Sequence, residues 1–285
     1  MGMSPEELER RRGVVGASET VLLFGLPTFG KRTIGDLWAE KKYGTERQWK
    51  GNDSTKFGLR LEKPILDEAE ERLGSPIVDR QLWLTRGCNG ATLDGRVDER
   101  TIVEAKTSGL LGPSTMSEWG EDESDDVPDS YLLQVQAQLL VSGAELAYLA
   151  ALIGGRGFAM FKISPNVDLQ TAIAEKAAEF IETLAGDVAP PELPQLETLK
   201  RIRRQPNKVV AIPDELKERF DEAKSKAKIA DGTAEQIQRE VLAALGDAEC
   251  GVCSNGAFTY YEQTMNYKAK EASQTTFRVL RFKKA

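Results

Sequence analysis

The sequence predicts an α/β fold, a mixed central β-sheet flanked by helices, with a small helical-plus-strand appendage at the C-terminus. Strand-like segments alternate with amphipathic helical segments along most of the chain, and residues 91–107 carry the pattern of a β-hairpin. A proline-rich segment at 187–195 then interrupts regular structure. We therefore expect a core at residues 1–186, a proline-containing basic linker at 187–208 and the appendage at 209–285.

The composition excludes several classes of enzyme. The 285 residues include no histidine and only three cysteines, which rules out a Ser-His-Asp triad and any zinc site that needs histidine. Cys250 and Cys253 have only Cys88 as a further thiol, so a four-cysteine metal site within one chain is excluded and ordinary reduced thiols are expected. No apolar run approaches the roughly 20 residues of a membrane span, and no signal-peptide core is present. We expect a cytoplasmic protein without membrane contact.

The net charge of -7 has a local origin. Residues 118–129 carry seven acids and no base, so the remainder of the chain is neutral. This segment is predicted to be a mobile, solvated loop.

The N-terminal region is predicted to hold a short helix at 5–12 and a second helix that begins near Val21. Ser18 is placed to cap that second helix. A serine at a helix N-terminus preceded by Arg11 and Arg12 would also suit a phosphate, and the sequence leaves the two alternatives open.

The next segments alternate between helix and loop. An amphipathic helix is expected at 33–43 and a polar loop at 44–56. An apolar stripe closed by Gly74 predicts a further helix, which either starts around Leu61 or bends at Pro64. Residues 77–85 are predicted to be a strand that leads into the hairpin.

The predicted hairpin brings two acids together. Asp98, Glu99 and Arg100 are taken as a three-residue loop between two strands, and antiparallel counting then gives the pairing. The expected pairs are Val97 with Thr101, Arg96 with Ile102, Gly95 with Val103, and Asp94 with Glu104.

Because side chains alternate along a strand, Lys106 is expected on the face of Glu104, with Ala105 pointing the opposite way into the core. Facing carboxylates destabilise a sheet unless a cation lies between them. Mg²⁺ fits, because it takes one or two carboxylates and substrate phosphate oxygens. A solvated hairpin whose charges form surface salt bridges is the alternative.

The second half of the core is predicted as helix, two strands and helix. In the helix at 131–141, Tyr131, Gln134 and Gln138 share one face, which is either functional or simply exposed to solvent. Strands are expected at 146–153 and 158–163, joined by a glycine-rich turn, followed by a helix at 167–184. In the appendage, helices at 213–230 and 234–245, the second capped by Thr233, precede strands at 258–261 and 275–282.

These motifs resemble the PD-(D/E)XK nuclease superfamily, in its lambda-exonuclease or YqaJ-like viral recombinase branch. The resemblance covers about residues 8–185 and depends on the order of the motifs. They are a glycine and glutamate on a helix (Gly58 and Glu62), a strand aspartate (Asp94), a strand Glu-x-Lys (Glu104, Ala105 and Lys106) and Tyr-x-x-Gln (Tyr131 and Gln134).

The resemblance implies a role for each residue. Asp94, Glu104 and the carbonyl of Ala105 would bind one or two Mg²⁺ or Mn²⁺ ions, with Glu62 completing the metal site. Lys106 would activate the attacking water, Gln134 would steady that lysine and the scissile phosphate, and Tyr131 would flank the metal site. Ser18 with Arg11, or equally Arg12, would bind the 5′-phosphate of the cut strand.

The resemblance also implies 5′-to-3′ exonuclease action on linear double-stranded DNA, leaving 3′ tails for recombination. The partners implied are DNA ends, a single-strand annealing protein and further copies of the chain in a trimeric ring. An endonuclease of the same superfamily, a non-cutting DNA-binding or assembly module, and a plain α/β scaffold remain as alternatives. The acidic segment at 118–129 and the tail beyond the linker depart from the family pattern.

Overall fold

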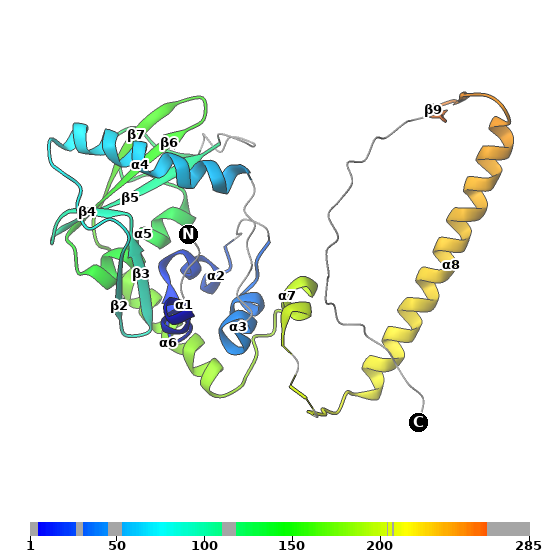
Figure 1. Cartoon of the computed structure of the whole chain (residues 1–285), viewed down its shortest axis with the longest axis horizontal. Helices are drawn as coiled ribbons and strands as arrows, with labels where there is room; N and C mark the ends of the chain where they lie inside the picture. The colour runs from blue at the N-terminus through cyan, green and yellow to red at the C-terminus, as the bar shows by residue number, and fades with distance from the viewer. Residues whose placement is uncertain are drawn as a thin grey trace. The chain divides into compact units, whose positions relative to one another are not determined.

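A computed structural model describes residues 5–26, 31–44, 53–109, 118–203, 205–206 and 208–260. The strand expected at 275–282 lies outside these residues. The chain divides into two units, Met1–Arg203 and Arg204–Ala285, which we describe separately (Figure 1). Among the described residues, no helix combines the length and the apolarity that crossing a bilayer requires.

The first unit alternates helices and strands. Its helical elements are α1 (Pro5–Arg12), a 3₁₀ turn η1 (Ala17–Glu19), α2 (Thr20–Leu23), α3 (Ile34–Tyr43), α4 (Asp53–Leu73), α5 (Asp129–Ser142), α6 (Val167–Ala185) and α7 (Leu196–Arg201). Its strands are β1 (Val15–Gly16), β2 (Leu82–Arg86), β3 (Asn89–Leu93), β4 (Gly95–Asp98), β5 (Thr101–Ser108), β6 (Leu146–Ile153) and β7 (Gly157–Ile163).

The expected α/β class with mixed pairing is confirmed, but the sheet is divided in two. One sheet has the order β1-β3-β2 and the other β4-β5-β6-β7, and each combines parallel and antiparallel neighbours. Only Asp94 separates β3 from β4, so this residue marks the place where the chain passes from one sheet to the other.

The hairpin register was predicted correctly at its base and wrongly at its tip. Gly95 pairs with Val103 and Arg96 with Ile102, as expected. At the tip, Asp98 instead of Val97 pairs with Thr101, because a register shift places one extra residue in β4. The strand expected at 77–85 is also shorter, since β2 begins only at Leu82.

Helices cover both faces of the four-stranded sheet (Figure 1). Neighbouring residues of β5 point to opposite faces. Ile102 belongs to the larger core, which lies under α5 and α6, while Val103 belongs to a smaller core with Ile65 and Leu66 of α4. Burying each such side chain stabilises the fold by about 1.5–3 kcal/mol. The alternation therefore leaves Glu104, two residues after Ile102, facing α5.

Two helix starts differ from expectation. Thr33 and Asp36 cap α3 reciprocally. The helix begins at Ile34, one residue after the predicted start at Thr33. Helix α4 begins at Asp53 and contains Pro64 in its interior, so the predicted start near Leu61 is wrong. The proline removes one backbone donor, yet the helix continues because its apolar face packs on β5 and β6.

The acidic segment at 118–129 is held to β7. Glu123 donates its backbone N–H to the carbonyl of Met160, and the carboxylate of Asp122 accepts from the Met160 N–H at 2.7 Å. Trp119 is buried against the ring of Phe161. The acids are exposed as expected, but Asp122 and the backbone are bonded to β7, so the segment does not form the free loop that was predicted.

The segment after α6 packs closely on α3. A Cβ built on Gly35 would lie 2.1 Å from the carbonyl oxygen of Glu192, so only glycine fits there. Gln195 donates its backbone N–H to Asp36 at 2.8 Å, and Arg201 of α7 lies 3.6 Å from the carboxylate of Glu40. Backbone and side-chain contacts thus join residues 192–201 to α3, within the first unit.

The second unit contains α8 (Asp214–Leu245) and a hairpin of β8 (Cys250–Cys253) and β9 (Gly256–Thr259). The two helices predicted here form one, and Thr233 donates its hydroxyl to the carbonyl of Ile229 in place of capping a second helix. Glycine at position 232 costs about 1 kcal/mol of helix stability relative to alanine. This low helix propensity alone does not interrupt the helix. All three cysteines of the chain are free thiols.

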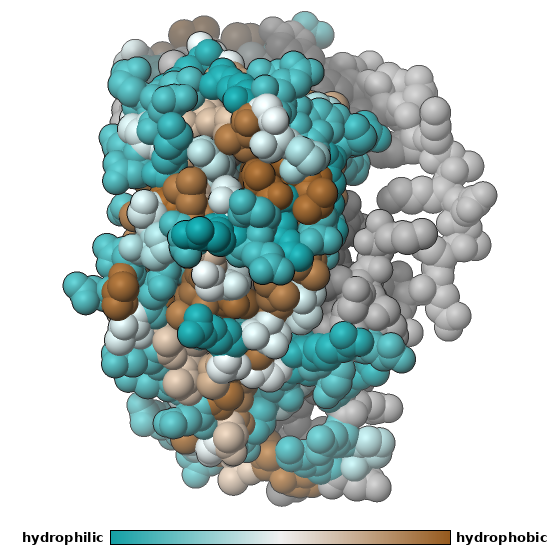
Figure 2. All heavy atoms as spheres, turned by 90° about the vertical axis from the view of Figure 1, so that its left-hand side faces the viewer, coloured by the Kyte–Doolittle hydropathy of each residue, from teal (hydrophilic) through white to brown (hydrophobic). Residues whose placement is uncertain are grey.

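The face on the left of Figure 1 is mainly hydrophilic, with smaller apolar clusters between the polar residues (Figure 2). Such a mixture is ordinary for a protein surface.

Candidate active site

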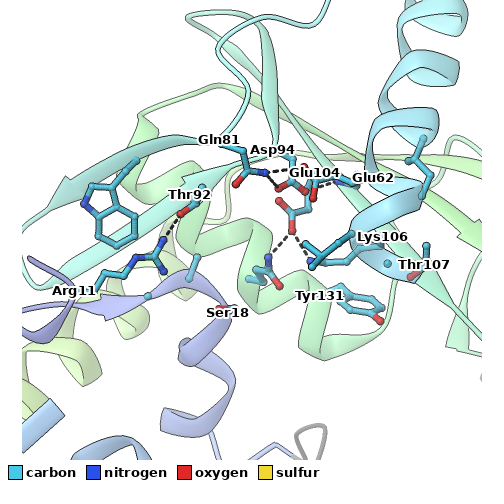
Figure 3. Close-up of a pocket in the computed structure, with 18 residues that line it drawn as sticks. Arg11, Ser18, Glu62, Gln81, Thr92, Asp94, Glu104, Lys106, Thr107 and Tyr131 are labelled. Atoms are coloured by element: carbon cyan, nitrogen blue, oxygen red, sulfur yellow. Dashed lines mark hydrogen bonds and ion pairs between the residues drawn. The ribbon is translucent and has the colours of Figure 1, made fainter. Parts of the chain in front are cut away.

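A pocket of about 530 Å³ lies where the two sheets meet (Figure 3). Its walls come from α1, η1, α4, the strands β2, β3 and β5, and helix α5. It gathers every predicted site residue except Arg12. These residues are Arg11, Ser18, Glu62, Asp94, Glu104, Ala105, Lys106, Tyr131 and Gln134.

Glu104 is the most deeply buried acid of the pocket, with 2% of its surface exposed. Its Oε1 accepts from Lys106 Nζ and from Gln134 Nε2, both at 2.5 Å, and its Oε2 accepts from Gln138 Nε2 at 2.6 Å. A carboxylate has about four acceptor positions, so three donors leave room for one further partner. The polar face of α5 is therefore turned inward, onto this carboxylate.

Asp94 lies at the bend between β3 and β4. Its Oδ2 accepts the backbone N–H of Ala105 at 2.9 Å, which ties the bend to β5. Burial and then the charge of Glu104 raise the pKa of Asp94 to about 8, although Lys106 and the Ala105 N–H act in the opposite direction. The pocket thus holds more negative charge than its own donors neutralise.

Gln81 connects Asp94 to the third acid, Glu62. Its Nε2 donates to Glu62 Oε1 at 2.7 Å and lies 3.4 Å from Asp94 Oδ1 (Figure 3). Its backbone is left-handed, with φ of 62°. Sequence reasoning missed this residue, because nothing in the local pattern marks a glutamine before a strand as part of a site.

The carboxylate oxygens of the pocket are the kind of ligand that a hard divalent cation binds. Glu62, Asp94 and Glu104 offer only oxygen, and the raised pKa of Asp94 shows that a positive charge here would relieve repulsion. Within the described part of the chain, however, no three acidic or cysteine side chains are already close enough to enclose an ion. The carboxylates line one pocket but are held apart by the amides and Lys106.

Lys106 remains positively charged. Burial alone would lower its pKa, but the carboxylates of Glu104 and Asp94 outweigh burial and raise it. Its ammonium also lies 5.7 Å from the centre of the Tyr131 ring. Lys106 is therefore a donor and a counter-charge in this arrangement.

Arg11 and Ser18 lie across the pocket from the acids (Figure 3). Arg11 Nη2 donates to Thr92 Oγ1 at 2.6 Å, and its guanidinium stacks 4.3 Å from the ring centre of Trp83. Ser18 is exposed within η1. Two polar groups, one of them cationic, thus face the carboxylates.

The family model of the YqaJ-like viral recombinase domain matches residues 8–145. Residues 8–145 are therefore similar to this family, and we call them the YqaJ-like domain. All of the pocket residues named above fall within it.

Similarity to a curated protein extends past this YqaJ-like domain. The uncharacterized protein YqaJ of Bacillus subtilis (strain 168) is 28% identical over 271 residues, which span 89% of this chain and 82% of that protein. The second unit is thus partly included in the similarity.

Solved structures show the same fold. The crystal structure of LHK-Exo in complex with dAMP superposes with a TM-score of 0.50 and 16% identity, covering 65% of this chain and 94% of that one. A second structure of LHK-Exo, described as an alkaline exonuclease from Laribacter hongkongensis, gives a TM-score of 0.49 and 17% identity over the same shares. The first of these matches shows that the 65% of this chain that it covers shares the fold of LHK-Exo.

Two expectations at the N-terminus of the YqaJ-like domain need correction. Ser18 does not cap α2. The Glu19 carboxylate instead accepts the Gly16 N–H at 2.9 Å, closing the turn. Arg12, considered equal to Arg11, does not line the pocket, and it pairs with Glu9 at 2.7 Å.

Lys41 fixes the wall that carries Arg11 and Ser18. Its buried Nζ donates to the carbonyls of Arg11 at 2.9 Å and Val14 at 2.6 Å, and contacts Glu19 Oε2 at 2.8 Å. A signal was available, because Lys41 continues the apolar stripe of α3, where a lysine needs buried partners.

Proposed function

We propose that this chain is a metal-dependent deoxyribonuclease that digests linear double-stranded DNA from 5′ ends and leaves 3′ single-stranded tails for recombination. The observation that carries the proposal is the pocket itself, in which Asp94, Glu104 and Lys106 face Arg11 and Ser18. Similarity of residues 8–145 to the YqaJ-like viral recombinase domain supports a nuclease role.

We place one or two Mg²⁺ or Mn²⁺ ions at Glu62, Asp94 and Glu104, with the carbonyl of Ala105 as a further ligand. When bound, the ions would supply Lewis-acid stabilisation of the charge that develops on the phosphate. Oxygen donors and the surplus negative charge of the pocket support this assignment.

The remaining groups orient the reactants. Lys106 carries three N–H donors and gives one to Glu104, so its other donors can hold the attacking water or a phosphate oxygen. Gln134 donates to Glu104 Oε1, the same oxygen that accepts from Lys106 Nζ. It thereby keeps both Glu104 and Lys106 in place. Tyr131 closes the pocket beside the lysine.

Arg11 and Ser18 supply the end recognition. A guanidinium stacked on Trp83 and bonded to Thr92 is held in one orientation, which suits binding of a terminal phosphate. Placed opposite the carboxylates, a 5′-phosphate bound here sets the distance to the bond that is cut.

The wider assignments belong to the same proposal. We expect the chain to act in the cytoplasm, to form a trimeric ring around DNA and to pass its product to a single-strand annealing protein. The surplus acids at 118–129 leave the active site free, since none of them lines the pocket. A ring needs only its channel face to be basic.

The test is digestion of matched linear duplexes with 5′-phosphate or 5′-hydroxyl ends beside a closed circle, with Mg²⁺ and with chelator. The phosphorylated duplex should disappear first and only with metal, and the circle should survive. Lys106→Ala should be inactive, whereas Lys162→Ala, an exposed lysine on β7, should behave as the unaltered protein.

Each other outcome overturns part of the proposal. Cutting of the circle makes the protein an endonuclease. Equal rates on both linear duplexes contradict a role for Arg11 and Ser18 in end recognition. Tight DNA binding without cleavage under either metal identifies a non-cutting binding module.

A further inference from the structure

Helix α8 is 32 residues long and buries none of its residues among the described contacts of its unit. Large apolar side chains on it are half exposed, including Leu216 at 51%, Phe220 at 42% and Ile237 at 54%. An isolated helix of this length gains most of its stability from covering such a face. The helix therefore needs a partner for its apolar side.

The apolar side has the spacing of a coiled coil. From Leu216 onward, apolar residues recur at alternating steps of four and three, which is the a and d pattern of a heptad repeat. Ile229 is the large apolar residue that lies outside this stripe and is exposed. The stripe consists of Leu216, Phe220, Ala223, Ala227, Ala230, Ala234, Ile237, Val241 and Ala244.

Residue size along the stripe is symmetric. The middle positions, Ala223 to Ala234, are all alanine, and they are flanked by Leu216 and Phe220 on one side and by Ile237 and Val241 on the other, with Ala244 beyond Val241. Small residues let two helices approach closely, and larger ones fill the space where the helices diverge. Two copies of the stripe that run in opposite directions can therefore be aligned with large residues facing large residues and alanines facing alanines.

Charges beside the stripe are also arranged for a reversed copy. The flanking e and g positions are basic in the N-terminal half, at Lys217, Arg219, Lys224 and Lys226, and include acids in the C-terminal half, at Asp231 and Glu240. Such flanking charges determine the orientation of paired helices.

We infer that α8 pairs with α8 of a second copy of this chain as an antiparallel two-stranded coiled coil. In the register that aligns a with d positions, Phe220 lies on the partner's Ile237, and Leu216 on the partner's Val241. Ala227 then meets the partner's Ala230, and Ala223 the partner's Ala234. Each contact occurs twice, because the pair has two-fold symmetry.

The same register pairs opposite charges. Arg219 faces the partner's Glu240, and Lys224 faces the partner's Asp231. A parallel pair would instead place Arg219 beside the partner's Lys224, two like charges. Antiparallel pairing therefore satisfies both the size pattern and the charge pattern.

The first test measures the mass of the full chain by sedimentation equilibrium. Ala227→Glu places a carboxylate in the centre of the seam on both helices and should reduce the mass to that of the assembly that the first unit forms by itself. Ser225→Glu, on the outer face of the same helix, should leave the mass unchanged. Far-UV circular dichroism of both variants shows whether α8 itself is retained.

The second test fixes orientation by disulfide formation in a background with Cys88, Cys250 and Cys253 changed to serine. A mixture of Ala223→Cys and Ala234→Cys chains should cross-link between copies, while Ala223→Cys alone should not. Cross-linking of Ala223→Cys alone would show a parallel pair and overturn the proposal.

A charge exchange completes the series. Arg219→Glu should weaken pairing, and adding Glu240→Arg in the same chain should restore it. An unchanged mass in Ala227→Glu, or an absence of cross-links in the mixture, would show that α8 packs within its own chain or on another protein. Cleavage activity is unaffected by these results, so they are separable from the proposed nuclease function.

Discussion

Two clusters of charged side chains in the first unit balance their charges differently. The acidic cluster consists of Glu62, Asp94, Glu104 and Lys106. The balanced cluster consists of Glu19, Glu40, Arg32 and Lys41. In the first, acids outnumber the base by three to one, and in the second the two signs are equal.

The difference appears in the pKa values of the acids. Burial raises the pKa of Asp94 and the neighbouring Glu104 raises it further. Burial also acts to raise the pKa of Glu19, but Lys41 and Arg32 more than offset it, and the pKa falls below its ordinary value. At Glu40, the other acid of the balanced cluster, burial outweighs Arg32 and the pKa is raised, so charge balance lowers the pKa of Glu19 alone.

Asp94→Asn should produce the largest effect. Removing one acid from the pocket should lower the cleavage rate by about 10³-fold, as expected when a group that stabilises the transition state is lost. The measurement is single-turnover cleavage of a 5′-phosphorylated duplex with saturating metal. Asp67→Asn removes an acid of α4 outside the pocket and should keep full activity. Comparable rates in the two variants would contradict the site.

Lys41→Met should cost stability in the balanced cluster. It leaves Glu19 and the carbonyls of Arg11 and Val14 without their donor, and breaking a buried pair in this way costs about 3–5 kcal/mol. Urea unfolding monitored by circular dichroism gives the change. Lys63→Met, an exposed lysine of α4, should cost under about 1 kcal/mol. A small effect at Lys41 would mean that the wall of the pocket is held by other contacts.

Asp94→Asn should raise the stability of the fold when metal is removed, whereas Lys41→Met should lower it. With chelator at pH 7, the folded chain holds Asp94 largely protonated, because its pKa rises from 3.8 to about 8, and the amide removes the cost of taking up that proton on folding. The free energy of unfolding should therefore rise by on the order of 1–3 kcal/mol. The gain should shrink when Mg²⁺ is added, because the metal binds the unaltered protein more tightly. A loss of stability under chelator would show that the Ala105 contact outweighs the repulsion.

Glu19→Gln should give the smallest effect, and one that depends on pH. The pKa of Glu19 is lower in the folded chain than in the unfolded chain, so the ionised carboxylate stabilises the fold at neutral pH. That contribution is lost as the pH falls below about 4.5, the ordinary value for glutamate. The unaltered protein should therefore exceed the variant in stability at pH 7, with the difference shrinking toward pH 3. A difference that is constant with pH would point to packing.

The parts of the site that could be predicted follow from alternation along one strand. Glu104 and Lys106 face the same way and Ala105 the other, because side chains of a strand alternate strictly. The order of motifs along the chain then led to Asp94 and Gln134 by resemblance to a known family.

The parts that could not be predicted depend on geometry between elements. Arg11 and Arg12 are neighbours in sequence, and only the path of α1 past α3 decides which one enters the pocket. Gln81 acts through contacts with distant segments, which no local pattern records. The apolar stripe of α3 indicates that Lys41 is buried, but not which groups it binds. The extra residue of β4 at the hairpin tip had the same cause, since several loop lengths fit the same polar residues.

The boundaries of α4 and α8 were predicted wrongly for a further reason. Pro64 and Gly232 are unfavourable within helices, and local rules end a helix near them. Packing of α4 on β5 and β6 compensates for Pro64. If α8 is paired as we propose, the same compensation for Gly232 comes from a second copy.

The close approach of Gly35 to Glu192 has a practical consequence for dissecting the chain. A truncated protein that ends at residue 186 would lose the backbone that covers Gly35 and the N–H that Asp36 binds, and would leave Thr33 without its contact to Leu193. One that ends at residue 203 keeps these contacts and α7. Limited proteolysis should accordingly spare residues 192–201, and the shortest fragment that folds by itself should extend well past the prolines.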